Sequence, residues 1–172
     1  MPVGDPSMQG AGATPTDATA RRILLVYGGH PGGRTEKLRA AAESGVREVG
    51  ENVSLAAVPA LECGPAHVLA ADAVLLGTPE HFGYMSGALK DFFDRSFYPL
   101  EGRTAGLPYA LFVSAGNDGT GTVRAVERII AGLGWSAVAA PLVVVGDPDE
   151  AALARARELG AMLAAGVAAG IF

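Results

Sequence analysis

Short apolar segments alternate along the chain with longer segments in which apolar residues recur every three or four positions. The short segments have the composition of buried strands and cover residues 23–27, 53–57, 73–77, 109–113 and 137–145. Strands that alternate with helices form a mostly parallel sheet covered by helices on both faces. The pattern therefore predicts an α/β domain with a doubly wound sheet, whose ligand crevice lies beyond the carboxyl ends of the strands.

Four longer segments have the apolar spacing of helices, and residues 68–71 predict a further short one. We expect Gly50 and Gly134 to end two of these helices, because glycine most easily adopts the left-handed conformation of a helix end. The acidic residues at 147–150 suit the N-terminus of the last helix. The apolar positions are Leu38, Ala42, Val46 and Val49, then Met85, Leu89, Phe92 and Phe93, then Val123, Val126, Ile130 and Leu133, and finally Leu153, Leu159 and Leu163.

Residues 1–20 differ in composition from the rest of the chain. They contain three prolines, several glycines and little apolar bulk, so we expect a disordered tail followed by one domain at residues 21–172. The tail lacks the basic and apolar regions of a signal peptide. The longest apolar run, at residues 159–172, is interrupted by glycines and is shorter than the ~20 residues that span a bilayer. These features predict a cytoplasmic protein that does not enter a membrane.

Charge and cysteine content narrow the classes of partner and site. The chain has 13 Lys and Arg against 18 Asp and Glu, a formal net charge of −5. A net negative charge does not favour a nucleic-acid-binding protein, which typically carries a basic surface. Cys63 is the single cysteine, which excludes an intrachain disulfide and any metal site built from several cysteines.

The loop at residues 28–35 joins the first predicted strand to a helix. Its glycines let backbone amides approach an anion, Thr35 offers a hydroxyl, and the helix N-terminus favours negative charge. No lysine precedes Thr35, so the loop is no Walker A motif, and the spacing of a dinucleotide fingerprint is absent. The loop is either a phosphate cradle or a tight turn shaped by glycines.

Two further loops follow the third and fourth predicted strands. Residues 78–84 combine aromatic side chains with proline and glycine, which suits a rigid shelf for a flat ring; alternatively, Phe82 and Tyr84 fill the core beneath the loop. Residues 114–121 have little side-chain bulk, so exposed backbone hydrogen-bonding groups are the main contacts that they offer to a ligand. Alternatively, they are a flexible connector. The three loops meet at the edge where a parallel sheet binds its ligands.

Residues 71–79, with the sequence ADAVLLGTP, are followed by Phe82-Gly83, by MSGALK at 85–90 and by Phe93-Asp94. This stretch resembles the second flavin loop of the flavodoxin-like NAD(P)H-dependent FMN reductases and quinone reductases. The other two loops have the spacing that this family needs, so the resemblance covers nearly all of residues 21–172. It implies a flavodoxin-like FMN-binding domain with a five-stranded parallel sheet in the order 2-1-3-4-5.

The resemblance also implies an FMN site. Where the family usually has Ser or Thr at the start of the phosphate loop, this chain has His30, and it adds the cationic Arg34; both side chains offer donors to a phosphate. The implied residues are His30, Gly32, Gly33, Arg34 and Thr35 around the phosphate, Pro79, Glu80, His81, Phe82, Gly83 and Tyr84 along the isoalloxazine ring, and Ser114, Ala115, Gly116, Asn117, Asp118 and Gly119 over its other edge.

The leading functional hypothesis is an FMN-dependent oxidoreductase that takes a hydride from NADH or NADPH and passes electrons to a quinone or flavin acceptor. The cofactor carries the chemistry, so no catalytic side chain and no metal is expected. The alternatives are a flavodoxin-type electron carrier without its own substrate and a flavin-free interaction domain. The absence of aromatic residues from 114–121 favours an enzyme with one open flavin face.

Several other residues have simpler interpretations. Asp91 and Asp94 lie beside Lys90 and Arg95 and predict a solvated charged helix face. Cys63 has no evident activating base and is expected to be inert, and His67 to be a surface or half-buried histidine. Trp135 is expected to pack at the start of the fifth strand. The Ala- and Gly-rich C-terminal segment either packs against a second subunit, giving a homo-oligomer, or completes the last helix.

A response-regulator receiver shares the expected strand order. It needs an acidic cluster after the first strand to bind magnesium, and this chain has Tyr27-Gly28-Gly29-His30 there. The receiver alternative is therefore excluded.

Overall fold

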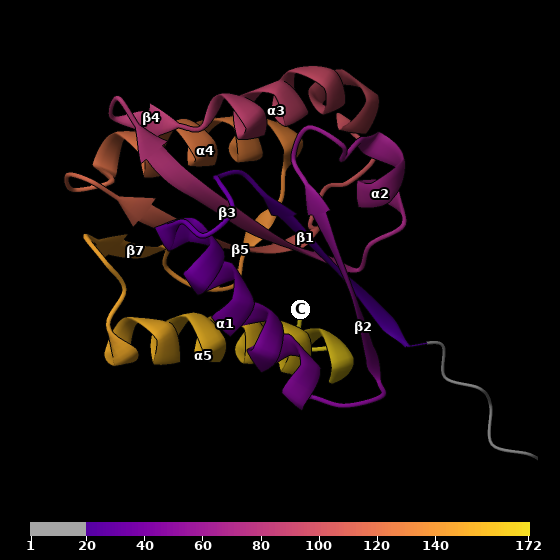
Figure 1. Cartoon of the computed structure of the whole chain (residues 1–172). Helices are drawn as coiled ribbons and strands as arrows, with labels where there is room; N and C mark the ends of the chain where they lie inside the picture. Colours follow the sequence, from indigo (N-terminus) through magenta and orange to yellow (C-terminus); the bar gives the residue numbers. More distant parts are fainter. Residues whose placement is uncertain (1–19) are drawn as a thin grey trace, which may run out of the picture.

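The structure, a computed structural model, describes residues 20–172 (Figure 1). The tail expected at residues 1–20 lies outside these residues except for Ala20, and the boundary at residue 21 stays a prediction. Continuously apolar segments form the centre of the sheet, because such strands are buried on both faces. The strands are β1 (Arg21–Tyr27), β2 (Val53–Pro59), β3 (Ala73–His81), β4 (Tyr84–Met85), β5 (Pro108–Ala115), β6 (Ser136–Ala137) and β7 (Leu142–Val145).

The sheet has the order β2-β1-β3-β5-β6, with β7 also pairing with β5 and β4 pairing with β3. All of these pairings are parallel except that of β3 with β4. Since β6 and β7 are two parts of the expected fifth strand, the predicted order 2-1-3-4-5 is confirmed. The break falls at residues 138–141, which end in Pro141, a residue that has no N–H to donate to a ladder.

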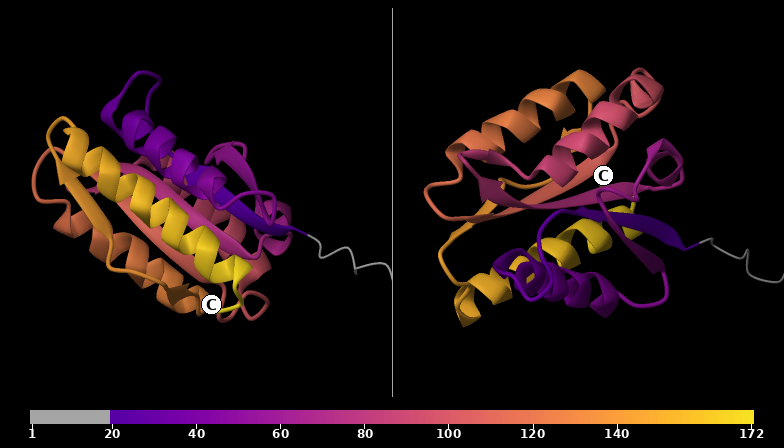
Figure 2. Two further views of the ribbon diagram at one scale, coloured as in Figure 1. Left: turned by 90° about the horizontal axis from the view of Figure 1, so that it is seen from below. Right: turned by 45° about the horizontal axis from the view of Figure 1, so that its top comes forward.

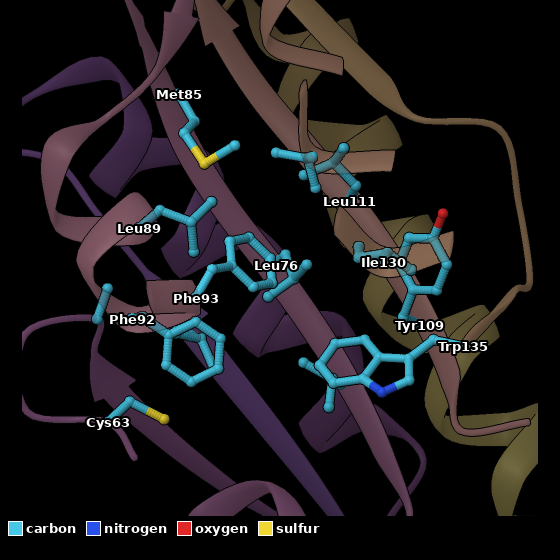
Figure 3. Close-up of a cluster of buried hydrophobic side chains, with 14 of the residues drawn as sticks. Cys63, Leu76, Met85, Leu89, Phe92, Phe93, Tyr109, Leu111, Ile130 and Trp135 are labelled. Atoms are coloured by element: carbon cyan, nitrogen blue, oxygen red, sulfur yellow. The ribbon is translucent and has the colours of Figure 1, made fainter. Parts of the chain in front are cut away.

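The segment expected to be a loop at 78–84 is mostly strand. β3 continues to His81, a turn at Phe82-Gly83 reverses the chain, and β4 runs back along β3. Met85, which has helical spacing with Leu89, therefore belongs to β4 and lies before the helix; the periodicity alone placed it wrongly. Met85 is nevertheless buried beside Leu89 and Phe93 in the same core (Figure 3).

Helices cover both faces of the sheet. Figures 1 and 2 show α1 and α5 side by side on one face and α3 and α4 on the other. Gly134 ends α4 in the left-handed conformation, with φ of 70°, as expected. Asp149 accepts a hydrogen bond from the Ala152 amide, 2.7 Å away, and begins the last helix. The helices are α1 (Arg34–Glu48), α2 (Pro65–Leu69), α3 (Gly87–Leu100), α4 (Thr120–Leu133) and α5 (Glu150–Ala168).

The sheet divides the core into two clusters of buried side chains. The cluster under α3 and α4 contains the aromatic residues Phe92, Phe93, Tyr109 and Trp135 (Figure 3). Trp135 packs just before β6, as expected, and its indole N–H donates to Thr104 Oγ1 over 2.8 Å, so its polar atom is not left unsatisfied. Truncating one such aromatic typically costs about 3–5 kcal/mol.

The second cluster lies between the sheet and the helix pair α1 and α5. A Cβ atom at Gly160 of α5 would collide with the backbone of Ala42 in α1, so glycine allows the two helices to approach closely. The C-terminal segment completes α5, as the second alternative expected, whereas its packing against a second subunit stays a prediction. No helix in residues 20–172 is long and apolar enough to cross a membrane.

Candidate functional site

The carboxyl ends of β1, β3 and β5 bring the three predicted loops together. Parallel register explains this, because Tyr27 pairs with Gly77, and Pro79 pairs with Ser114. A pocket of about 200 Å³ opens between the strand ends. All of its lining residues come from the first loop, β3 or β5: Gly29, His30, Gly33, Arg34, Thr35, Pro79, Glu80, His81 and Ser114.

The first loop presents backbone amides at the N-terminus of α1. Gly29 and Gly32 have φ of 119° and 74°, values that residues other than glycine rarely adopt. Gly33 precedes the helix, and no side chain caps the helix N-terminus. The Glu36 carboxylate accepts a hydrogen bond from the Gly32 amide, and this bond holds the pKa of Glu36 below its ordinary value. An anion is thus already bound to one amide of this loop.

Two residues of the first turn of α1 connect this loop to β5. Thr35 Oγ1 and Ser114 Oγ lie 2.6 Å apart, and both residues are buried. The Arg34 guanidinium donates a long bond, 3.4 Å, to the carbonyl of Ala115. None of the ion pairs found within residues 20–172 involves Arg34, so its charge remains available to a bound anion.

His30 and His81 both line the pocket, and their rings lie near each other. Their ring centroids are 6.3 Å apart with an interplanar angle of 29°. His30 comes from the first loop and His81 from the last residue of β3, and both side chains are exposed. The two imidazoles therefore lie close together in the exposed lining of the pocket.

Phe82 and Gly83 form the turn of the β3–β4 hairpin. Both have positive φ, 54° and 71°, as in the two-residue turns that join antiparallel strands. For a residue as bulky as phenylalanine this conformation is strained. The Phe82 side chain is fully exposed and Tyr84 is partly exposed, so the interpretation that they fill the core is wrong. A strained, exposed aromatic beside a pocket is a candidate ligand contact.

Glu80 reaches from β3 to the third loop, a contact that sequence reasoning missed. Its Oε2 atom accepts hydrogen bonds from the amides of Gly116, at 3.0 Å, and Asn117, at 2.7 Å. Two of the backbone groups expected to be free for a ligand are therefore already paired. The Thr120 amide donates to the Asp118 carboxylate, which lowers the pKa of Asp118, and Gly119, with φ of 68°, is the residue just before α4.

Residues outside the pocket match their simpler interpretations. Asp94 pairs with Lys90, and Asp91 pairs with Arg95 over 2.7 Å, on an exposed face of α3. Cys63 is buried, and its desolvation raises the pKa of the thiol to about 11. His67 Nδ1 accepts a hydrogen bond from the Gly64 amide at the start of α2. Within residues 20–172 no three His, Cys, Asp or Glu side chains gather as a metal site.

Residues 21–149 match the family model of the NADPH-dependent FMN reductases. The chain belongs to this family. The reductase is 27% identical, over 141 residues, to the NAD(P)H dehydrogenase (quinone) of Paracoccus denitrificans (strain Pd 1222), and the match covers 69% of this chain and 67% of that protein. Membership makes the protein an FMN-dependent NAD(P)H oxidoreductase, as the resemblance implied.

The fold of the reductase is that of the flavodoxins. A flavodoxin from the domain Archaea superposes with a TM-score of 0.74 at 19% identity, covering 85% of this chain and 98% of that one. The two-electron reduced flavodoxin of Megasphaera elsdenii superposes with a TM-score of 0.69 at 23% identity, covering 83% and 98%. The predicted flavodoxin-like fold is confirmed.

Proposed function

We propose that the pocket between the three loops is the FMN site of this reductase and that a quinone is its electron acceptor. The observation that carries the proposal is the meeting of the uncapped N-terminus of α1, Arg34 and Thr35 with the ends of β3 and β5 in one pocket. An anion of the size of a phosphate suits the helix end, and a flat ring suits the strand ends and the glycine-rich loop that follows β5.

The phosphate is assigned to His30, Gly32, Gly33, Arg34 and Thr35. The Gly32 amide donates to the Glu36 carboxylate, so this amide already points toward a negatively charged acceptor, which a bound phosphate would replace. Arg34 adds a cation without a carboxylate partner among the described residues. Because hydrogen bonds to charged groups are stronger than neutral ones, Arg34 and the helix amides together favour a phosphate dianion.

The isoalloxazine ring is assigned to residues 79–84 on one side and 114–119 on the other. Bound FMN supplies the ring system that receives electrons from NADH or NADPH and delivers them to the acceptor. The chain contributes the surroundings: Phe82 offers an apolar contact, His81 offers a ring N–H to orient an acceptor, and the small residues 114–121 leave space above one face. Nicotinamide and quinone then occupy that face in turn.

A titration of FMN and riboflavin into the FMN-free protein tests the site. A phosphate cradle predicts much tighter binding of FMN, because riboflavin lacks the phosphate; equal affinities would show that the first loop binds no phosphate.

Steady-state rates with NADH or NADPH and a benzoquinone test the acceptor. Sharing of one open face predicts parallel double-reciprocal lines, whereas intersecting lines would indicate a ternary complex. His81→Ala should lower turnover more than it lowers FMN content. If FMN binds and no quinone or free flavin supports NAD(P)H oxidation, the electron-carrier hypothesis replaces the quinone reductase.

The cellular location stays part of this proposal. Cys63 is the single cysteine, so the chain contains no intrachain disulfide that would need an oxidising compartment. This supports a cytoplasmic location.

A further inference from the structure

The carboxylate of Glu80 is placed by the register of two neighbouring strands. Pro79 of β3 pairs with Ser114 of β5, so the next residue of β3 lies beside the start of the third loop. From there Glu80 Oε2 takes up two successive amides, those of Gly116 and Asn117, at 3.0 and 2.7 Å. One acceptor atom therefore joins the second loop to the third.

Residues 116–118 of the third loop are exposed and have few other restraints, whereas Gly119 packs against Val143 and Gly121 against the backbone of Gly83. The contacts from the first loop reach only Ser114 and the carbonyl of Ala115, one to two residues earlier. A Cβ atom at Gly116 would meet no atom within 4 Å, so packing does not hold this residue. Asp118 bonds only to Thr120 within the same segment. Among the described residues, Glu80 supplies the side-chain bonds that fix residues 116 and 117 to the sheet.

We propose that Glu80 is a positioning residue of the flavin site, whose carboxylate holds the third loop in its binding shape before any flavin arrives. The proposal rests on the assignment of this pocket to FMN. Binding costs less when the loop that receives the ring is ordered in advance, because the ordering entropy is not lost at the moment of association. The amides of Gly116 and Asn117 then serve the loop itself and are not donors to the ring.

Glu80→Gln separates the effect of the hydrogen bonds to the third loop from the effect of the negative charge on the carboxylate. The glutamine amide oxygen has two lone pairs and can accept from both backbone amides, as Oε2 does, while the negative charge is absent. Alanine removes the acceptor altogether. Glu62→Ala is the matched control, because it deletes an exposed carboxylate from the turn after β2, away from the pocket.

Amide hydrogen exchange in the FMN-free protein measures the loop directly. We expect the Gly116 and Asn117 amides to exchange about tenfold faster in Glu80→Ala than in the wild type, the change that follows from losing a hydrogen bond to a charged group. Glu80→Gln should restore most of the protection, and Glu62→Ala should leave it unchanged. Unchanged exchange at both amides in Glu80→Ala would overturn the proposal.

FMN titrations of the same four proteins complete the test. Glu80→Ala should bind FMN roughly tenfold more weakly, with riboflavin weakened by the same factor, because the loop faces the ring and not the phosphate. Glu80→Gln should bind within about threefold of the wild type. If Glu80→Ala exchanges faster but binds FMN as tightly as the wild type, the positioning role is overturned. If the wild-type protein binds neither FMN nor riboflavin, the proposed FMN site is overturned, and the exchange result still stands.

Discussion

The hydroxyl oxygens of Thr35 and Ser114 lie 2.6 Å apart, although 79 positions separate the two residues in the chain. Thr35 belongs to the first turn of α1, and Ser114 is the second-last residue of β5. A hydroxyl group donates one hydrogen and accepts others. When Ser114 donates to Thr35, the hydrogen of Thr35 is free for an anion in the pocket. The pair thus links the end of β5 to the phosphate loop.

Replacing Ser114 with alanine should weaken FMN binding about three- to tenfold, the effect of one neutral hydrogen bond. The lost bond leaves the Thr35 hydroxyl without its partner, so its direction is no longer set. A titration that follows the fluorescence of the free flavin measures the change in FMN affinity, and riboflavin serves as the control ligand. A loss of the same size for riboflavin would mean that Ser114 acts on the ring and not through Thr35.

Arg34→Ala should weaken FMN by about tenfold at low salt, because a charge-assisted bond to the phosphate is removed. Arg34 is exposed, so solvent and salt screen its charge and the effect should shrink as salt is added. Arg34→Lys keeps the charge and should retain most of the affinity. Unchanged FMN affinity of Arg34→Ala at low salt would remove Arg34 from the site.

Phe82→Asn should stabilise the FMN-free protein by roughly 1 kcal/mol, because asparagine tolerates the left-handed conformation that costs phenylalanine energy. The same change should weaken FMN binding, since the exposed phenyl group is lost. Urea unfolding of the FMN-free protein and flavin titration measure the two effects. Phe82→Ala is the control: it removes the ring while keeping a side chain that is strained at this φ. A Phe82→Asn variant that is less stable than wild type would contradict the strain argument.

The Cys63 thiol should react slowly with iodoacetamide at pH 8 in the folded protein. Its pKa is raised to about 11 because burial disfavours the thiolate, so the reactive form appears only as the pH rises toward that value. In urea the thiol should react at the rate of an ordinary cysteine. Fast modification of the native protein would contradict both the burial of Cys63 and the expectation that it is inert.

The sequence by itself determined the kinds of element and their order. The strands of the sheet and the helices that cover it follow from the period of the apolar residues, a property of each segment alone. Gly134 and Asp149 end and begin helices where their local chemistry predicts, and the loops after β1, β3 and β5 are named as the site because parallel strands end at one edge. The MSGALK segment also led to the family.

The tertiary structure decided how those loops are joined. The extension of β3 into a hairpin, with Phe82 in its turn, has no signal in the apolar pattern, because a two-residue turn depends on the strands that flank it. The Gly116 amide donates to Glu80 across 36 positions of the chain, and the hydroxyls of Thr35 and Ser114 are bonded across 79 positions. The first bond depends on the register that places the end of β3 beside the end of β5, and the second on the packing of the start of α1 beside the end of β5. Both arrangements are properties of pairs of elements, not of either sequence segment.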